Sequence, residues 1–308
     1  YSSKRYGNTK IDAKGGEGND SFNLWSGDTE SGGTTSLNAS GDAGNDNINV
    51  SSYQTRAGGT TSINANGGVG NDTIRINGHY NNGVSNINIS GGSGTDSITV
   101  SEDTSGRNNE KTSDYGFRKV VIDAGADDDT ITVQGSLNTN ITTGSGSDTI
   151  RLTSHQYRTQ QQGKRNLYDS NGRVNGTQNA DPITITDFTT GKGGDILDYS
   201  DLLKSAAVNY NGENPFSSGH IKLVQSGKDT LFQFDADGTG SSTQLLTLAV
   251  LANTTASQLL TDNFNPNFPP DGSAAAGQII QGTANSENLR GGFGNDTVSG
   301  LAGDDTID

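Results

Sequence analysis

Aspartates recur in this sequence at the end of glycine-rich stretches. They are Asp20, Asp46, Asp72, Asp96, Asp129 and Asp148. The first four follow one another at intervals of 26, 26 and 24 residues, and the spacing then loosens. Glycine tolerates positive φ angles, which can bring backbone carbonyl oxygens into a small arc. A carboxylate that closes such an arc completes an anionic, all-oxygen pocket that suits a hard cation such as calcium.

Two glycines of each regular turn complete the candidate metal set. They stand five and two residues before the aspartate, and they are Gly15, Gly18, Gly41, Gly44, Gly67, Gly70, Gly91 and Gly94. If the turns stack, their carboxylates come close together and repel one another unless cations lie between them. Metal binding and folding are therefore expected to be one process. Asp46 and Asp72 would each serve two adjacent sites, whereas Asp20 lies at the end of the row.

Short strands must position these turns, because apolar residues alternate on both sides of each one. Two and four residues after the aspartates stand, for example, Ile48 and Val50, and nine and seven residues before them stand Leu37 and Ala39. Alternation of this kind is typical of strands with one buried face. Each repeat is thus predicted to be a strand, a glycine turn, a strand and a variable loop. One unit cannot bury its own apolar residues, but stacked units share a narrow core, so residues 1–160 predict an all-β, parallel β-roll or β-solenoid of about six coils. An antiparallel sandwich also has regularly spaced strands, but sandwiches do not repeat one turn so faithfully.

The composition is consistent with a narrow core, and it excludes some classes of binding partner. Only 28% of the 308 residues are hydrophobic, 44 are glycine and none is cysteine. The net charge of −15 argues against nucleic acid and anionic membranes as partners. The sequence has no apolar run long enough to span a bilayer, so no membrane insertion is expected. It does not begin with methionine and it stops inside a motif, so we expect it to be a piece of a longer polypeptide.

The repeated segments resemble a known family. "GGEGNDSFN", "GDAGNDNIN", "GGVGNDTIR", "GGSGTDSIT", "GGFGNDTVS" and "GLAGDDTID" are similar to the RTX nonapeptide GGxGxDxUx, whose β-roll binds calcium. The last two segments add Asp296 and Asp305 to the candidate ligands. RTX rolls usually carry turns on both sides, nine residues apart, whereas residues 11–152 carry the motif on one side only, which implies one calcium row there. "DAGADDDTI" and "TTGSGSDTI" lack several glycines, so the resemblance is weaker at Asp129 and Asp148.

A second stretch, residues 182–272, is similar to C-terminal regions of RTX proteins exported by type I secretion. It begins with "ITDFTTGKGGDILDYSDLL". We expect a β-rich capping domain over 182–264, between a linker at 161–181 and another at 265–277, and a second roll that starts at 278–308. Within the cap we expect a hairpin around Ser226-Gly227 and a short helix at "TASQLL" capped by Thr255. Asp195, Asp198 and Asp201 could serve catalysis, but capping and turn roles or a calcium contact are preferred.

Aromatic residues gather in the variable loops, opposite the predicted calcium row. Trp25, Tyr53, Tyr80 and Tyr115 occupy comparable places in successive coils. They could cap the end of the core, or they could form a recognition stripe for a glycan or for a neighbouring copy of the protein.

These observations favour a non-enzymatic, calcium-loaded module of a large bacterial protein. It would be secreted, or held at the cell surface of a Gram-negative bacterium as an adhesin or surface-layer component, and it would fold on calcium binding after export. The alternative is a polysaccharide lyase or epimerase built on a β-helix, or the carbohydrate-binding module of such an enzyme.

Overall fold

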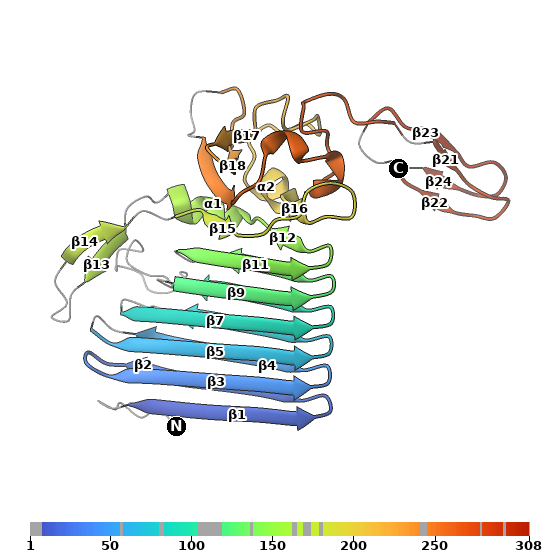
Figure 1. The fold of residues 1–308 in the computed structure, drawn as a ribbon. Helices are drawn as coiled ribbons and strands as arrows, with labels where there is room; N and C mark the ends of the chain where they lie inside the picture. Colours follow the sequence, from blue (N-terminus) through green and yellow to red (C-terminus); the bar gives the residue numbers. More distant parts are fainter. Residues whose placement is uncertain are drawn as a thin grey trace.

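The fold is built on two parallel sheets that face each other across a narrow core (Figure 1). A computed structural model describes residues 8–55, 58–79, 83–103, 119–135, 138–161, 165–168, 174–178, 181–240, 245–277, 279–291 and 294–307. The 10-stranded sheet has the order β1-β3-β5-β7-β9-β11-β15-β19-β18-β17, and the 8-stranded sheet has the order β2-β4-β6-β8-β10-β12-β16-β20. From β1 to β12, and again at β15 and β16, successive strands alternate between the sheets, so each pair forms one coil. The predicted parallel β-roll is confirmed.

The strands of the first sheet are β1 (Thr9–Glu17), β3 (Thr34–Ala43), β5 (Thr60–Val69), β7 (Val84–Ser93), β9 (Lys119–Ala126), β11 (Thr139–Ser145), β15 (Ile183–Ile185), β17 (Ile221–Ser226), β18 (Asp229–Phe234) and β19 (Leu246–Leu251). Those of the second are β2 (Ser21–Thr29), β4 (Asn47–Thr55), β6 (Thr73–His79), β8 (Ser97–Asp103), β10 (Thr130–Gln134), β12 (Thr149–Arg151), β16 (Ile196–Asp198) and β20 (Phe264–Asn265).

The coils stack in strict register, so equivalent side chains lie one above another. Ile48 pairs with Ile74 and Ile74 with Ile98, and all three are completely buried. This aliphatic ladder explains how a chain with few apolar residues forms a core, because each branched side chain fills the space between the two sheets. The coil formed by β1 and β2 is less covered, since Ile11, Phe22 and Leu24 are only partly buried. The glycine turns align along one side of the stack and the loops lie on the other (Figure 1).

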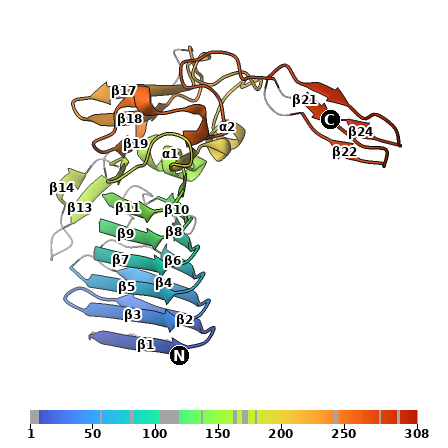
Figure 2. The ribbon, with the colours of Figure 1, turned by 45° about the vertical axis from the view of Figure 1, so that its right-hand side comes forward.

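The C-terminal side of the stack is closed by strands of the predicted capping region, which continue the same two sheets. β15 pairs in parallel with β11, and β16 with β12. β17 and β18 then form an antiparallel hairpin that joins the first sheet through β19, as the sequence predicts. Helices α1 (Ser154–Gln161) and α2 (Ser200–Ser205) lie beside these strands (Figure 2). The division of the chain into separate domains stays a prediction.

The rings of Tyr199, Phe216, Phe232 and Phe264 pack together within the predicted capping region, with centroids 5.2 to 6.2 Å apart in the contacting pairs. The helix expected at "TASQLL" is a single 3₁₀ turn, η2 (Ala256–Gln258), and Thr255 makes no side-chain cap hydrogen bond to it. A second such turn, η3 (Thr261–Asn263), precedes β20.

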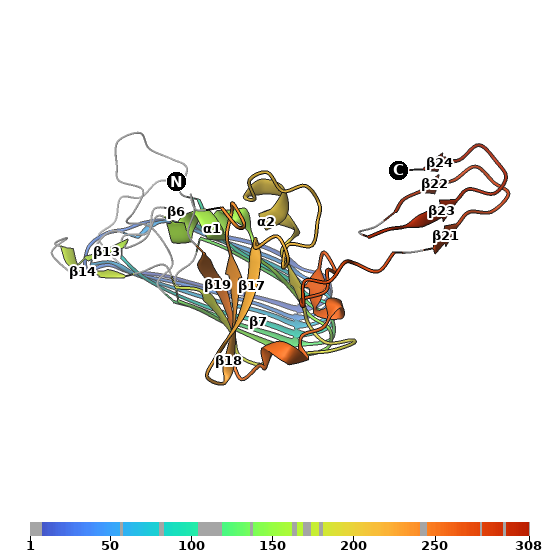
Figure 3. The ribbon, with the colours of Figure 1, turned by 90° about the horizontal axis from the view of Figure 1, so that it is seen from above.

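Two smaller parts lie outside the main stack. β13 (Arg165–Tyr168) and β14 (Val174–Gln178) form an antiparallel pair. β21 (Ile279–Gln281) pairs in parallel with β23 (Thr297–Ser299), and β22 (Asn288–Leu289) pairs with β24 (Thr306–Ile307). These last four strands stand apart from the stack when it is seen from above (Figure 3). None of the helices in the described part of the chain has the length and apolar character that crossing a bilayer requires.

The apolar side chains of the first coil are less buried than those of the middle coils, and this difference provides a test of the fold. Ile74→Ala removes a completely buried side chain and should lower the free energy of unfolding of the calcium-loaded protein by about 3 kcal/mol. Ile11→Ala, at the partly covered end, should cost less than half as much. Guanidinium unfolding followed by circular dichroism measures both, and equal losses would contradict the stacking order described above.

Candidate metal centre

The glycine turns are shaped by backbone conformations that only glycine adopts easily. Gly18, Gly44, Gly70 and Gly94 have φ angles of 101°, 130°, 130° and 108°. A Cβ atom on Gly44 would lie 2.2 Å from the carbonyl oxygen of Gly18 in the preceding coil, closer than any side chain can approach. The Gly44 N–H donates to the Val69 carbonyl of the following coil at 2.8 Å. These glycines therefore allow successive turns to stack in contact.

The aspartates of the turns form a ladder of hydrogen bonds along the stack. The Asp46 N–H donates to Oδ1 of Asp72, and the Asp72 N–H donates to Oδ1 of Asp96, each at 2.7 Å. The same bond joins Asp20 to Asp46, Asp96 to Asp129 and Asp129 to Asp148, at 2.7 to 2.8 Å. Each carboxylate from Asp46 to Asp148 thus accepts a bond from the preceding coil through one oxygen. The sequence prediction that these side chains come together is consistent with this geometry.

A second ladder runs in the opposite sense, and sequence reasoning missed it. The side-chain oxygen of Asn19 accepts from the Asn45 N–H, and that of Asn45 accepts from the Asn71 N–H, each at 2.8 Å. The signal for this ladder is the Asn-Asp pair that ends the first three turns. Together the two residues join each turn to both of its neighbours.

The other carboxylate oxygen of each turn is buried and has no hydrogen-bond partner within the structure. This holds for Oδ2 of Asp20, Asp46, Asp72, Asp96, Asp129 and Asp148. A buried, unpaired carboxylate oxygen is costly unless a donor or a cation satisfies it. The unpaired oxygen therefore marks the point at which a ligand is required.

A backbone carbonyl lies beside that oxygen. A Cβ atom built on Gly41 would lie 2.0 Å from Oδ2 of Asp46 and 2.5 Å from the carbonyl oxygen of Gly67 in the next coil. Gly15 and Gly67 show the same arrangement. Because these glycines have no side chain, a carboxylate oxygen and a carbonyl oxygen approach the same point of the backbone. Oxygen donors of this kind fit calcium.

Such sites use backbone oxygens and do not need several acidic side chains. Among the described residues no three histidine, aspartate or glutamate side chains converge on one point. Each candidate site instead combines one carboxylate per coil with carbonyl oxygens of adjacent turns. When bound, calcium would supply positive charge to the row and would replace the missing donor at Oδ2.

Burial makes the row from Asp72 to Asp148 hard to ionise in the absence of metal. Burial, with a smaller contribution from the neighbouring carboxylates, raises the pKa of Asp96 to about 6 and that of Asp129 to about 8. Burial raises the pKa of Asp148 to about 7, with Asp195 adding to the shift. The pKa of Asp72 is raised for the same reasons. The metal-free fold thus favours protonated carboxyls.

The two irregular turns keep the carboxylates in line. Ala124 and Thr143 stand where the regular turns have their first glycine, and Asp127 takes the place of another glycine with a φ of 78°. Asp and Asn tolerate this conformation better than other side chains do. The space beside Asp129 and Asp148 therefore contains a side chain that the regular turns lack.

The row ends at Asp195, which sequence reasoning considered only as one of several nearby acids. Its Oδ1 accepts from the Asp148 N–H at 3.1 Å, so it continues the ladder. Its Oδ2 accepts from the Thr189 N–H at 2.8 Å and lies 3.1 Å from the Thr143 hydroxyl. Unlike the other members it is satisfied by the protein.

Asp198 and Asp201, the other two acids of that group, have the turn and capping contacts expected of them. The Ser200 N–H donates to Asp198 at 3.0 Å and the Ser154 N–H donates to Asp201 at 2.7 Å.

The four short C-terminal strands repeat the turn on alternating sides. Asp296 precedes β23 and Asp305 precedes β24, and these strands belong to different sheets. A Cβ atom on Gly300 would lie 2.4 Å from Oδ2 of Asp305, as in the main stack. The Glu287 N–H donates to Oδ1 of Asp305 at 3.0 Å. Glu287 thus stands where the motif has aspartate, and this replacement hid the turn from sequence reasoning.

Comparison with protein families agrees with this geometry. Residues 281–308 match the family model of the RTX calcium-binding nonapeptide repeat, which describes four copies of the repeat. Residues 281–308 thus carry RTX calcium-binding repeats. A search of curated proteins finds no match to the chain. The matched repeat is a calcium-binding one, which supports Ca²⁺ as the ion of this chain, and the individual ligands named above remain a prediction.

Two of the four loop aromatics lie in the part of the chain that the structure describes. Trp25 and Tyr53 are 51% and 39% exposed, in β2 and β4. Tyr80 and Tyr115 lie outside the described residues. A shared recognition stripe therefore stays a prediction.

Removing one charge from the middle of the row tests the assignment of the ligands. Asp72→Asn keeps an oxygen that accepts the Asp46 N–H but removes the negative charge, so the calcium concentration at half-folding should rise about tenfold. Asp20→Asn, at the end of the row, should have a smaller effect. Asp123→Asn, on the exposed face of β9, is the matched control and should have none. Similar midpoints for all three variants would refute a stacked row.

The raised pKa values predict how acid affects the calcium-free chain. Between the ordinary value of 3.8 and about 8, the folded chain binds more protons than the unfolded chain, so its stability falls as the pH rises. Acidifying the calcium-free protein from pH 8 to pH 5 should therefore increase its β-sheet circular dichroism signal. Calcium displaces these protons, so calorimetry at pH 7 in buffers of different ionisation enthalpy should show proton release. A signal that falls on acidification, with no release, would contradict the assignment.

Proposed function

We propose that this chain is a calcium-dependent structural module of a bacterial protein that is secreted or held at the cell surface. The observation that carries the proposal is the row of buried Oδ2 atoms with no partner in the protein. A fold that buries stacked carboxylates needs cations to form, and its stability then follows the calcium concentration by mass action.

This dependence suits a protein that must cross a membrane before it folds. Where calcium is scarce, the net charge of −15 and the unneutralised row oppose compaction. Where calcium is abundant, the same row holds the coils together. RTX proteins are typically secreted, and the resemblance of residues 182–272 to type I secretion regions supports the same route. The chain has no cysteine, so calcium takes the place that disulfides have in many small secreted domains.

A mechanical role at the surface is favoured over catalysis. The carboxylates of the row are buried and bonded to the backbone of neighbouring turns, so they are not presented to a substrate. The RTX repeat family is generally structural. A stiff stack of coils suits an adhesin or a surface-layer component, in which one end must be held at a distance from the other.

Calcium-driven folding is the direct test. In excess chelator the chain should give a circular dichroism spectrum of a largely unfolded polypeptide, and the β-signal should appear cooperatively as calcium reaches the millimolar range. Magnesium at the same concentration is the control and should restore little, because it demands a smaller octahedral site and keeps its water. A β-sheet circular dichroism spectrum that does not change in excess chelator would contradict the proposal.

A further inference from the structure

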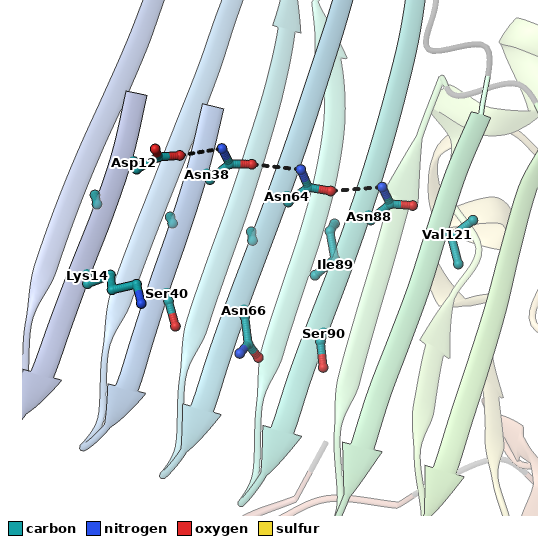
Figure 4. A pocket seen from close by; sticks show the side chains of 13 residues that line it. Asp12, Lys14, Asn38, Ser40, Asn64, Asn66, Asn88, Ile89, Ser90 and Val121 are labelled. Carbon is teal, nitrogen blue, oxygen red and sulfur yellow. Dashed lines mark hydrogen bonds between the residues drawn. The ribbon is translucent and has the colours of Figure 1, made fainter. Parts of the chain in front are cut away.

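The outer face of the first sheet carries a shallow groove of about 460 Å³ that crosses β1, β3, β5 and β7 (Figure 4). Two rows of side chains border it, and successive members of each row are paired in register. One row is Asp12, Asn38, Asn64 and Asn88, and the other is Lys14, Ser40, Asn66 and Ser90. The groove lies on the outer face of the sheet, and each member of its second row directly precedes the first glycine of a turn.

Amides of the first row are held in one orientation by their own hydrogen bonds (Figure 4). Nδ2 of Asn38 donates to Asp12 at 2.6 Å, that of Asn64 to Oδ1 of Asn38 at 2.7 Å, and that of Asn88 to Oδ1 of Asn64 at 2.9 Å. An amide has two N–H groups and two lone pairs on its oxygen. The ladder therefore leaves a donor and an acceptor on Asn64 for a ligand.

The second row adds hydrogen-bonding groups that the protein does not use. Within the described chain, the side chains of Asn66 and Ser90 make no hydrogen bond, and Oδ1 of Asn88 accepts none. These groups carry no charge, and the ionic side chains Asp12 and Lys14 stand only at the β1 end. The two rows thus border the middle of the groove with a preoriented, neutral array of donors and acceptors, over a lining that is largely apolar.

Geometry limits what could occupy this array. Neighbouring strands lie about 4.8 Å apart, so the four strands offer a run of about 14 Å along the stack. Val121 follows Asn88 in register and ends the amide row at β9. A chain that presents hydroxyl groups at intervals close to one strand spacing fits this run, and an extended sugar chain does so with about one ring per strand.

Other classes of ligand fit less well. An extended peptide repeats every 3.4 Å or less and gains its affinity from free strand edges, which a sheet face does not offer. Nucleic acid is opposed by the net charge of −15.

We propose that this groove binds an uncharged, extended oligosaccharide along the axis of the stack, through hydrogen bonds to Asn38, Asn64 and Asn88. No aromatic ring is among the residues that line the groove. The affinity therefore rests on hydrogen bonds exchanged with water, and we expect a dissociation constant in the millimolar range. Repeated copies on one surface would raise the effective affinity. The proposal does not depend on how the chain is exported.

Chemical-shift mapping on the calcium-loaded protein tests the proposal. The probes are the β-1,4-linked hexasaccharides of glucose and of N-acetylglucosamine, added to 10 mM. At least one should shift the amide resonances of Asn38, Asn64, Asn66 and Asn88 in a saturable way. If neither probe shifts them, or if the shifts gather at Trp25 and Tyr53 instead, the groove is not the site.

A matched pair of variants completes the test. Asn64→Val with Asn88→Val gives these positions the residue type that the chain has at Val121, and it should weaken binding at least tenfold. Asn49→Val, on the opposite sheet, removes a comparable amide that accepts from Asn77 at 3.0 Å and should leave binding unchanged. Equal affinity of the double variant and the unmodified chain would overturn the proposal. Self-association through this face, seen as a change in oligomeric state when the protein is diluted, would also overturn it, because the groove would then bind a second copy of the chain. If the double variant does not fold, the chemical-shift changes of the unmodified chain still test the proposal.

Discussion

One buried oxygen atom in each coil governs this structure. Oδ2 of the turn aspartate is enclosed by its own glycine turn and by the next coil, and the protein supplies no donor to it. The other features of the turn hold this oxygen in its buried position. Glycines with positive φ allow the coils to touch, the Asp and Asn ladders lock the turns together, and the aliphatic ladder holds the strands in register. Without a cation the same contacts bury carboxyl oxygens that nothing satisfies, so we expect order along the whole stack to depend on the metal.

The side of the stack that carries the glycine turns and the side that carries the loops are therefore under different constraints. If the turns bind calcium as we propose, coordination fixes the length and conformation of each turn, whereas the loops on the other side are free to vary. The sheet faces lie between these extremes, since register is imposed on them but side-chain identity is not. The amide row of the groove exploits this freedom, because strict stacking converts one residue per coil into an evenly spaced ladder.

The repeat period and the alternation of apolar residues were enough to predict the stack, its parallel strands and the meeting of the aspartates. Local sequence could not show the side-chain ladders, because their partners lie a full coil away and the direction of each bond is a tertiary property. Asp195 was missed as a ladder member since it follows Asp148 after a long insertion that breaks the period. Glu287 was missed because a different acid fills the motif position. The cap reads as a separate unit in sequence, yet β15 and β16 extend the same sheets, since their exposed edges are satisfied only by pairing with β11 and β12.

Locating the metal ions is the most direct test of the claim that calcium binds along the row of turn aspartates. Crystals grown in calcium and measured for anomalous scattering should show one line of peaks beside Oδ2 of Asp20, Asp46, Asp72 and Asp96, about 4.8 Å apart along the stack, and none among the loops. Peaks confined to the loops, or turns that keep their shape with water at Oδ2 and no calcium in the row, would contradict it.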